Sequence, residues 1–321
     1  MAKPLSGRVA VVAGATRGAG RGIARMLGEA GAQSTALDAV AACSQTRRVT
    51  CTRVVLKPSK KLQRWLRGMG ARESRGVLTT RRRLKSPRCL SRSLASRTGW
   101  ILASVITGQA ASWKSFLEET PAEGKSFVDG WIWPHVVTAW HGAKLMTQHR
   151  AGLIVELVEQ DNVGYHGAFY FDLMETLLKR LVLGLANDLG KSAITAVAVA
   201  PGFMRTEAIL EGFGVTESDW RNALSHPQAA AMGWGGSETP CFVGRAVAAL
   251  AADPDVARKN GGIYTTRMLS EEYGFQDVDG SRPDYAVLDV AIEEAKKTFL
   301  APSIDAGRFT SVDWKLALKS R

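Results

Sequence analysis

Apolar residues along the chain alternate between two patterns, short continuous runs and stretches with a helical period. Residues 8–13 form a short apolar run, which is typical of a strand. A helical period follows it and stops at Gly31. The same alternation returns further along, with helical periods at residues 136–146 and 169–189 and strand-like runs at residues 152–158 and 194–200. This order predicts an α/β fold class, a doubly wound parallel sheet covered by helices on both faces.

The helix expected over residues 169–189 has two apolar sides. One is a stripe of leucines at four-residue steps. Its members are Leu173, Leu177, Leu181 and Leu185. Leu178 and Val182 form the second apolar side.

The composition is typical of a globular protein. The 321 residues are 45% hydrophobic and 22% charged, which excludes disorder along the whole chain. No apolar run approaches the roughly 20 residues that a membrane span needs. The first residues lack the apolar core of a signal peptide, and the four cysteines show no CxxC spacing. We therefore expect a cytoplasmic protein with no leader, no membrane association and no disulfide framework.

The net charge of +12 comes from one part of the chain. Residues 33–112 contain 17 of the 42 Lys and Arg residues but only two acidic residues, Asp38 and Glu73. The rest of the chain contains 28 of the 30 Asp and Glu residues and is close to neutral. The basic segment also holds three of the four cysteines and shows poor helical or strand periodicity. Its charge therefore describes this segment and not the chain as a whole.

Three hypotheses account for the basic segment. A basic arm would bind nucleic-acid phosphates, but Trp65 is the only aromatic residue between Gln33 and Gly99, so we expect no nucleic-acid partner. A disordered insertion is the second hypothesis. The third, which we favour, is translation out of frame, since a shifted frame of GC-rich coding sequence yields Arg, Ser and Cys with few acids. Translating the other two frames across these codons tests it; if neither contains alternating strands and helices, the hypothesis is wrong.

A glycine-rich turn joins the first strand to the first helix. The residues that follow the first strand are Gly14-Ala-Thr-Arg-Gly-Ala-Gly20. Glycines at such a turn let the backbone approach a pyrophosphate, and the N–H groups that open the helix bind its charge. Strand, glycine turn and helix in this order predict a dinucleotide-binding βαβ unit. A tight turn in an unrelated α/β protein is the alternative.

The spacing Gly-x-x-x-Gly-x-Gly resembles the short-chain dehydrogenase/reductase family, whose motif begins with Thr where this chain has Ala13. The resemblance implies a Rossmann-type domain over residues 1–285, an extension over residues 286–321, and NAD or NADP as cofactor. Arg17 stands where NADP-preferring members often carry a basic residue, which favours NADP; a solvated helix-start residue is the alternative. The cofactor-binding residues that the resemblance implies here are Gly14, Thr16, Arg17, Gly18, Ala19 and Gly20.

A second segment resembles the cofactor-binding region of the family. Pro201 and Gly202 follow directly on the strand-like run at residues 194–200, and Thr206 comes four residues later. In the family this Pro-Gly segment covers the nicotinamide and its Thr contacts phosphate, so all three residues join the expected cofactor site. The segment over residues 203–236 would form a substrate lid. Its apolar residues suggest an apolar substrate, and they include Phe203, Met204, Ile209, Leu210 and Phe213.

The catalytic residues of the family are missing from the matching positions. The family uses a Ser after the preceding strand and then Tyr-x-x-x-Lys, in which the Lys lowers the Tyr pKa. The phenol then passes a proton while the nicotinamide passes a hydride. In this chain the Tyr falls on Phe171 and the Lys on Glu175. The Ser falls on Val158 or Glu159, and the family's helix Asn falls near Trp131.

Tyr170 is the one catalytic candidate that the alignment leaves. It is one residue out of register with the family's Tyr, and its neighbour one turn later is Met174 instead of a Lys. A packing residue with a polar tip is the alternative. We expect Glu175 to be an exposed helix charge, although a buried carboxylate near Tyr165 or His166 could do acid–base work.

Histidines and tryptophans gather before the strand-like run at residues 152–158. The spacing of His135, His141 and His149 does not place them on one helix face, so no metal site is expected. We expect the tryptophans to be core residues rather than parts of a substrate pocket; they are Trp131, Trp133 and Trp140.

The expected function is that of an NAD(P)-dependent oxidoreductase acting on a carbonyl or alcohol of a small apolar substrate. A catalytically inactive dinucleotide-binding homologue is the alternative, and nucleic-acid binding through residues 33–112 is a weaker one. Family members often pair through the long helix, so the resemblance also implies a homo-oligomer. Leu178 and Val182 would then contribute their apolar side to that interface.

Overall fold

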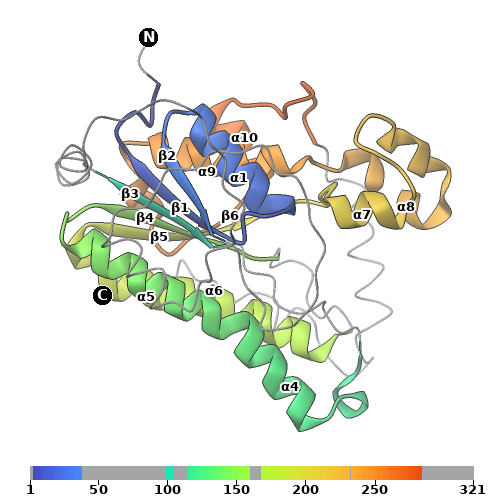
Figure 1. Cartoon of the computed structure of the whole chain (residues 1–321), viewed down its shortest axis with the longest axis horizontal. Coiled ribbons are helices and arrows are strands. Elements are labelled where there is room, and N and C mark those ends of the chain that lie inside the picture. The colour runs from blue at the N-terminus through green and yellow to red at the C-terminus, as the bar shows by residue number, and fades with distance from the viewer. Residues whose placement is uncertain (1–2, 38–98, 105–113, 160–167, 232, 284–321) are drawn as a thin grey trace, which may run out of the picture.

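Within the residues that the structure describes, six parallel strands form a central sheet (Figure 1). The computed structural model describes residues 3–37, 99–104, 114–159, 168–231 and 233–283. The strands are β1 (Val9–Ala13), β2 (Gln33–Leu37), β3 (Trp100–Ser104), β4 (Gly152–Leu157), β5 (Ile194–Ala200) and β6 (Ile263–Thr265), in the order β2-β1-β3-β4-β5-β6. The chain therefore changes direction across the sheet between β1 and β3. In a doubly wound fold this is the switch point at which ligands bind, outside the carboxyl ends of the strands.

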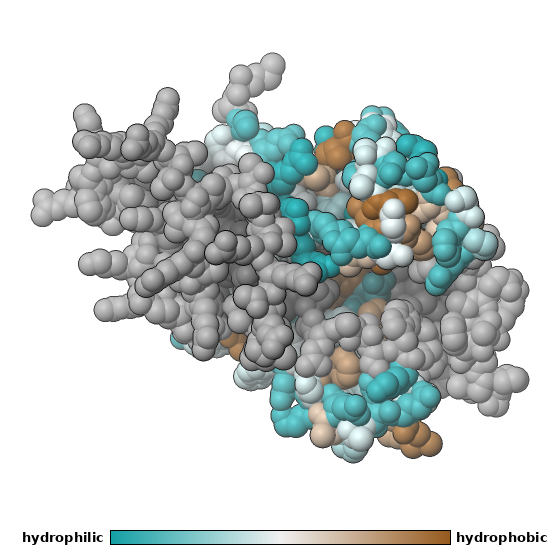
Figure 2. Space-filling view, turned by 45° about the vertical axis from the view of Figure 1, so that its right-hand side comes forward, coloured by the Kyte–Doolittle hydropathy of each residue, from teal (hydrophilic) through white to brown (hydrophobic). Residues whose placement is uncertain are grey.

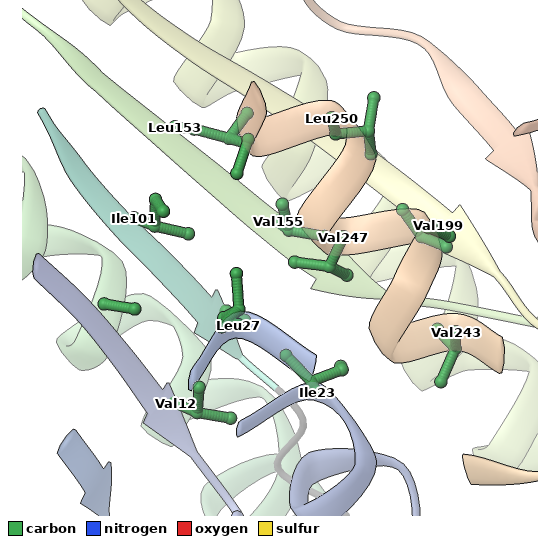
Figure 3. Packing of buried hydrophobic residues seen from close by; sticks show 14 of the residues in the cluster. Val12, Ile23, Leu27, Ile101, Leu153, Val155, Val199, Val243, Val247 and Leu250 are labelled. Atoms are coloured by element: carbon green, nitrogen blue, oxygen red, sulfur yellow. The ribbon is translucent and has the colours of Figure 1, made fainter. Parts of the chain in front are cut away.

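One face of the sheet is covered by α1 (Gly18–Glu29), α9 (Pro240–Ala252) and α10 (Thr266–Tyr273). Figure 3 shows aliphatic side chains from α1 and α9 meeting those of β1, β3, β4 and β5 in one core. The two helices approach closely because they cross at glycines. A Cβ at Gly22 would stand 1.7 Å from the carbonyl oxygen of Pro240, and one at Gly244 would stand 2.5 Å from that of Gly22.

The other face is covered by α4 (Pro121–Phe127), α5 (Trp133–Thr147) and α6 (Phe169–Leu189), which lie below the sheet in Figure 1. The long helix α6 confirms the element expected over residues 169–189. Leu178 and Val182 are buried against the sheet, whereas Leu173 and Leu177 are each 37% exposed. Of the two apolar sides, that of Leu178 and Val182 therefore packs on the sheet, and the exposed part of the leucine stripe faces outward.

A lid follows the fifth strand. It spans residues 203–236 and contains α7 (Glu207–Gly212), a 3₁₀ helix (Trp220–Ser225) and α8 (Pro227–Ala231). Its own small core forms around Trp220 and Trp234, whose indole N–H donates to the carbonyl oxygen of Trp220 at 2.8 Å. Figure 2 brings this side of the molecule forward and shows a mostly hydrophilic described surface with separate hydrophobic areas.

Two strands fall inside the segment that lacks legible periodicity. β2 begins directly after the first βα unit and pairs in parallel with β1, and β3, near the end of the basic segment, pairs in parallel with the other side of β1. Both ends of the basic segment therefore contribute a strand to the sheet. Most of the basic segment, the expected extension at residues 286–321, and Tyr165 and His166 lie outside the described residues. Within the described part, no helix combines the length and apolar character needed to cross a bilayer.

Candidate functional site

The glycine turn lies at the carboxyl end of β1 and opens α1. Gly14 and Gly18 adopt left-handed backbone conformations, with φ of +83° and +52°, which a side chain would strain. Gly20 is required for a different reason, since a Cβ there would stand 2.1 Å from the carbonyl oxygen of Gly14. The turn is thus tight enough to present the first N–H groups of α1 at the sheet edge, as anion binding requires.

The Pro-Gly segment leaves the carboxyl end of β5 and is held by one buried carboxylate. Oε2 of Glu238 accepts a hydrogen bond from the N–H of Gly202 at 3.0 Å and from the hydroxyl of Thr266 at 2.6 Å. The backbone N–H of Arg205 donates to the carbonyl oxygen of Glu238 at 2.8 Å. These contacts direct the chain from β5 back across the sheet edge.

The two segments meet at Gly18. A Cβ built on Gly18 would lie 3.4 Å from Cγ2 of Thr206. The N–H of Gly18 donates to Oε2 of Glu207 at 2.7 Å, and Oε1 of Glu207 lies 2.5 Å from a guanidinium nitrogen of Arg21. Residues almost 190 positions apart in the sequence therefore form one edge of the sheet, as a shared cofactor site requires.

The remaining residues of the expected cofactor site lie around this contact. Thr16 and Arg17 are exposed, and Ala19 is half-buried at the start of α1. Arg17 occupies the position just before the helix with an extended backbone, and its exposed side chain is free to reach a ligand phosphate.

A buried polar cluster lies on the opposite side of the same edge. Nδ1 of His135, on α5, lies 2.5 Å from Oε2 of Glu156, on β4. Ser104 pairs with Glu156 in the β3–β4 register, and all three side chains are buried. Burial raises the pKa of Glu156, while His135 and Ser104 oppose that shift. The cluster places a carboxyl group and an imidazole in contact inside the protein.

Glu175 is buried, so the expectation of an exposed helix charge is wrong. Its carboxylate accepts a hydrogen bond from the N–H of Glu159 at 2.7 Å. Burial and the nearby negative charge of Glu159 raise the pKa of Glu175 to about 7, against the opposing effects of that hydrogen bond, Lys179 and His135. A carboxyl group with this pKa changes protonation state near neutral pH.

Tyr170 packs against α4. Its phenol ring lies so close to Gly124 that a Cβ on that glycine would stand 2.1 Å from the ring. The ring also stacks on Phe127, with the ring centroids 6.0 Å apart. Phe171, at the position of the family's Tyr, meets Trp131 edge to face at 5.8 Å. The geometry thus gives Tyr170 a packing role, and its catalytic role stays a prediction.

The prediction that three tryptophans are core residues is confirmed for one of them. Trp131 is buried in the core beside α6, whereas Trp133 and Trp140 are 62% and 53% exposed. These two lie on α5, which presents one side to the sheet and the other outward. Within the described residues, no group of three or more His, Cys, Asp and Glu side chains is placed to hold a metal ion.

Comparison with known proteins identifies relatives along nearly the whole chain. The chain is 29% identical over 299 residues to dehydrogenase/reductase SDR family member 1 of Homo sapiens. This alignment covers 90% of this chain and 89% of the human protein. The Mus musculus protein of the same name is 26% identical over 329 residues, covering 99% and 98%. No family model matches the sequence. The chain is therefore similar along nearly its whole length to curated proteins named as members of the short-chain dehydrogenase/reductase family.

Solved structures of this type share the fold. A crystal structure of an assigned gluconate dehydrogenase from Agrobacterium tumefaciens aligns with a TM-score of 0.54 at 18% identity, covering 84% of this chain and 99% of that one. An assigned NAD(P)-dependent gluconate 5-dehydrogenase from Beutenbergia cavernae, with NADP bound at low occupancy, aligns with a TM-score of 0.51 at 20% identity, covering 83% and 97%. The predicted doubly wound fold of the short-chain dehydrogenase/reductase type is therefore confirmed.

Two features of this sheet edge were missed in the reading of the sequence. One is the pair formed by His135 and Glu156, although a carboxylate inside the otherwise apolar run at residues 152–158 was a usable signal. The other is the contact of Glu207 with Gly18, for which no local pattern exists because the two residues are distant in the chain.

Proposed function

We propose that this chain is an oxidoreductase that binds NAD or NADP and acts on a carbonyl or alcohol of a small apolar substrate. The observation that carries the proposal is the meeting of the glycine turn with the Pro-Gly segment, through the contact of Gly18 with Thr206. In a doubly wound sheet, dinucleotides bind at the carboxyl edge beside the first helix. Similarity to curated dehydrogenase/reductase proteins supports the same reading.

The residues at this edge fit a dinucleotide. The left-handed Gly14 and Gly18 and the crowded Gly20 let a phosphate approach the backbone at the N-terminus of α1. The exposed Arg17 supports a preference for NADP, because a guanidinium pairs with a 2′-phosphate in a bidentate manner. When bound, the nicotinamide would supply or accept the hydride, and the Pro-Gly segment would cover it.

The lid supports an apolar substrate. Phe203 and Phe213 pack on Trp234 with ring centroids 5.6 Å and 5.2 Å away, yet both remain partly exposed. Ile209 is likewise only partly buried. These side chains would give the substrate an apolar surface, whereas Met204 and Leu210 are buried in the protein.

Loss of catalysis is the second candidate, and the chain's own residues favour it. Phe171 has no proton to donate, and the buried carboxyl group of Glu175 replaces the cation that a phenolate needs. Tyr170 would have to leave its place on Gly124 to reach a substrate at the sheet edge. A protein that binds the dinucleotide without turnover is the outcome that this packing supports.

One experiment separates the two candidates. Wild-type protein is titrated with NADPH and NADH while tryptophan fluorescence is followed, and it is then assayed with a panel of carbonyl compounds. Binding with turnover that is lost in Tyr170→Phe supports an active enzyme with Tyr170 as the acid. Binding without turnover supports the inactive homologue. Absence of binding to either dinucleotide would refute both.

We also propose that the chain forms a homo-oligomer through the outward side of α6. Leu173 and Leu177 are exposed there, and Leu181 and Leu185 continue the stripe half-buried. A row of leucines along a helix is costly to leave in water, which supports its covering by a second copy. The side of Leu178 and Val182, which the resemblance implied for pairing, is buried in the core of this chain, so the proposal uses the outward leucines instead.

A further inference from the structure

A carboxylate of the chain itself lies at the N-terminus of α1. Oε2 of Glu207 accepts a hydrogen bond from the N–H of Gly18 at 2.7 Å, and Oε1 lies 2.5 Å from the guanidinium of Arg21. Gly18 is the first residue of α1, and Arg21 follows one turn later. The side chains of Arg21 and Glu207 are 39% and 35% exposed, so the ion pair is open to solvent on one side.

Both partners of Glu207 are groups that a phosphate would use. The N–H of Gly18 points out of the positive end of a twelve-residue helix. The guanidinium of Arg21 is a donor suited to phosphate as much as to carboxylate. One N–H cannot donate fully to two anions, and a pyrophosphate placed beside the carboxylate would meet a like charge. Glu207 and a dinucleotide phosphate therefore exclude each other at this position.

We propose that Glu207 is a built-in competitor of the dinucleotide, which holds Gly18 and Arg21 until a phosphate group displaces it. The inference rests on the proposed function, because it concerns the regulation of the same cofactor site. It makes Glu207 a determinant of cofactor affinity that acts against binding.

The position of Glu207 connects this competition to the lid. Glu207 is the first residue of α7, whose Leu210 packs into the lid core beside Trp220. Arg205, two residues earlier, is buried and fixed, because its guanidinium donates to Glu217 at 3.0 Å and to Asp279 at 3.1 Å. Displacement of the Glu207 carboxylate would therefore move α7 relative to Arg205, which stays in place. Cofactor binding and the position of the lid are then linked.

The test compares Glu207→Gln with the matched control Glu211→Gln, which removes an exposed carboxylate from the same helix. Dissociation constants for NADPH, NADH and inorganic pyrophosphate are measured by titration calorimetry on the full chain at one fixed ionic strength. We expect Glu207→Gln to bind NADPH and pyrophosphate about 10-fold more tightly, a change equivalent to about 1.4 kcal/mol. Glu211→Gln should bind them like wild type.

Each outcome decides between the inference and the function on which it rests. Wild-type binding of NADPH with equal or weaker binding by Glu207→Gln overturns the inference and leaves the proposed function standing. No binding of NADPH by any variant, with tighter pyrophosphate binding by Glu207→Gln, overturns the proposed function and supports the competition. If no variant binds NADPH and Glu207→Gln binds pyrophosphate no more tightly than wild type, both the proposed function and the inference are overturned.

A second variant and a second readout guard against misfolding. Glu207→Asp keeps the charge but shortens the side chain, so its affinity for NADPH should lie between those of wild type and Glu207→Gln. The near-ultraviolet circular dichroism of each variant reports whether the tryptophans of the lid core keep their packing. A folded Glu207→Asp that binds less tightly than wild type would contradict the proposal.

Discussion

His135 and Glu156 form a buried pair across the interface between α5 and β4, with Nδ1 and Oε2 2.5 Å apart. Their side chains are 2% and 0% exposed. A buried carboxyl group near the carboxyl end of a central strand is costly unless a partner is supplied. The helix that covers this end of the sheet supplies one, so the pair couples the position of α5 to the sheet edge.

Breaking this pair should destabilise the protein. We expect His135→Ala to lower the free energy of unfolding by about 3–5 kcal/mol, because it leaves a buried carboxyl group without its partner. Urea unfolding followed by circular dichroism measures the loss. The control is His226→Ala, which removes an exposed histidine of the lid.

Replacing both members of the pair tests the cause. His135→Leu combined with Glu156→Leu removes both polar groups together, so it should cost much less than His135→Ala. If the double variant is less stable than His135→Ala, the packing of the two side chains stabilises the protein more than their polar contact does.

Glu175 should make stability depend on pH. Its pKa in the folded protein is about 7, raised from 4.5 mainly by burial. The folded state therefore holds this proton more tightly than the unfolded state. Stability falls as pH rises from about 4.5 to about 7, by roughly 3 kcal/mol in total, and is level above that.

The measurement is urea unfolding of wild type and Glu175→Gln at a series of pH values from 4 to 8. The difference in unfolding free energy between wild type and Glu175→Gln should change with pH, because other titrating groups contribute equally to both proteins and cancel. Asp188→Asn, which removes an exposed carboxylate from the same helix, should leave the slope unchanged. A slope that survives in Glu175→Gln would assign it to another group.

Restoring the family's pair should restore catalysis if the cofactor edge is intact. Phe171→Tyr with Glu175→Lys supplies a phenol and a cation one helical turn apart. General acid–base catalysis contributes about 10²–10⁴-fold, so turnover of a carbonyl substrate with NADPH should rise by a factor in that range. Steady-state assays of wild type, both single variants and the double variant check it. A double variant that binds NADPH but is no faster than wild type would contradict the alignment.

Two glycines of α1 should respond to alanine in opposite directions. Gly22→Ala should destabilise the protein by about 1–3 kcal/mol, since its Cβ would collide with the carbonyl oxygen of Pro240. Gly28→Ala, in the same helix, meets nothing within 4 Å and should stabilise it by up to about 1 kcal/mol. Thermal unfolding measures the change in stability of each variant relative to wild type, and the two changes should have opposite signs. Equal effects would mean that helix propensity and not the α1–α9 crossing dominates.

Charging the outward stripe of α6 should separate the copies of the chain. Leu173→Glu with Leu177→Glu places two carboxylates in the proposed interface, where burial opposes charge. Size-exclusion chromatography with light scattering should then report a monomer where wild type reports an oligomer. Leu224→Glu, at a 40% exposed leucine of the lid, is the control and should leave the oligomer intact. A monomeric wild type would refute the interface directly.

The local elements of this protein were readable from its sequence because their signals are local. The glycine turn between β1 and α1, the apolar run of β5 and the Pro-Gly segment after it each depend on neighbouring residues. Their common order was enough to predict the doubly wound sheet. β2 was missed because its five residues carry no clear alternation of apolar and polar positions.

Tertiary structure alone decided which sides of the elements are buried and which distant groups meet. Periodicity reports the spacing of apolar residues, so α6 had two admissible sides, and packing on the sheet selected that of Leu178. Burial also turned Glu175 from an ordinary helix charge into a group that titrates near neutrality. Glu207 reaches Gly18 only because parallel strands bring their carboxyl ends to one edge, which no spacing along the chain encodes.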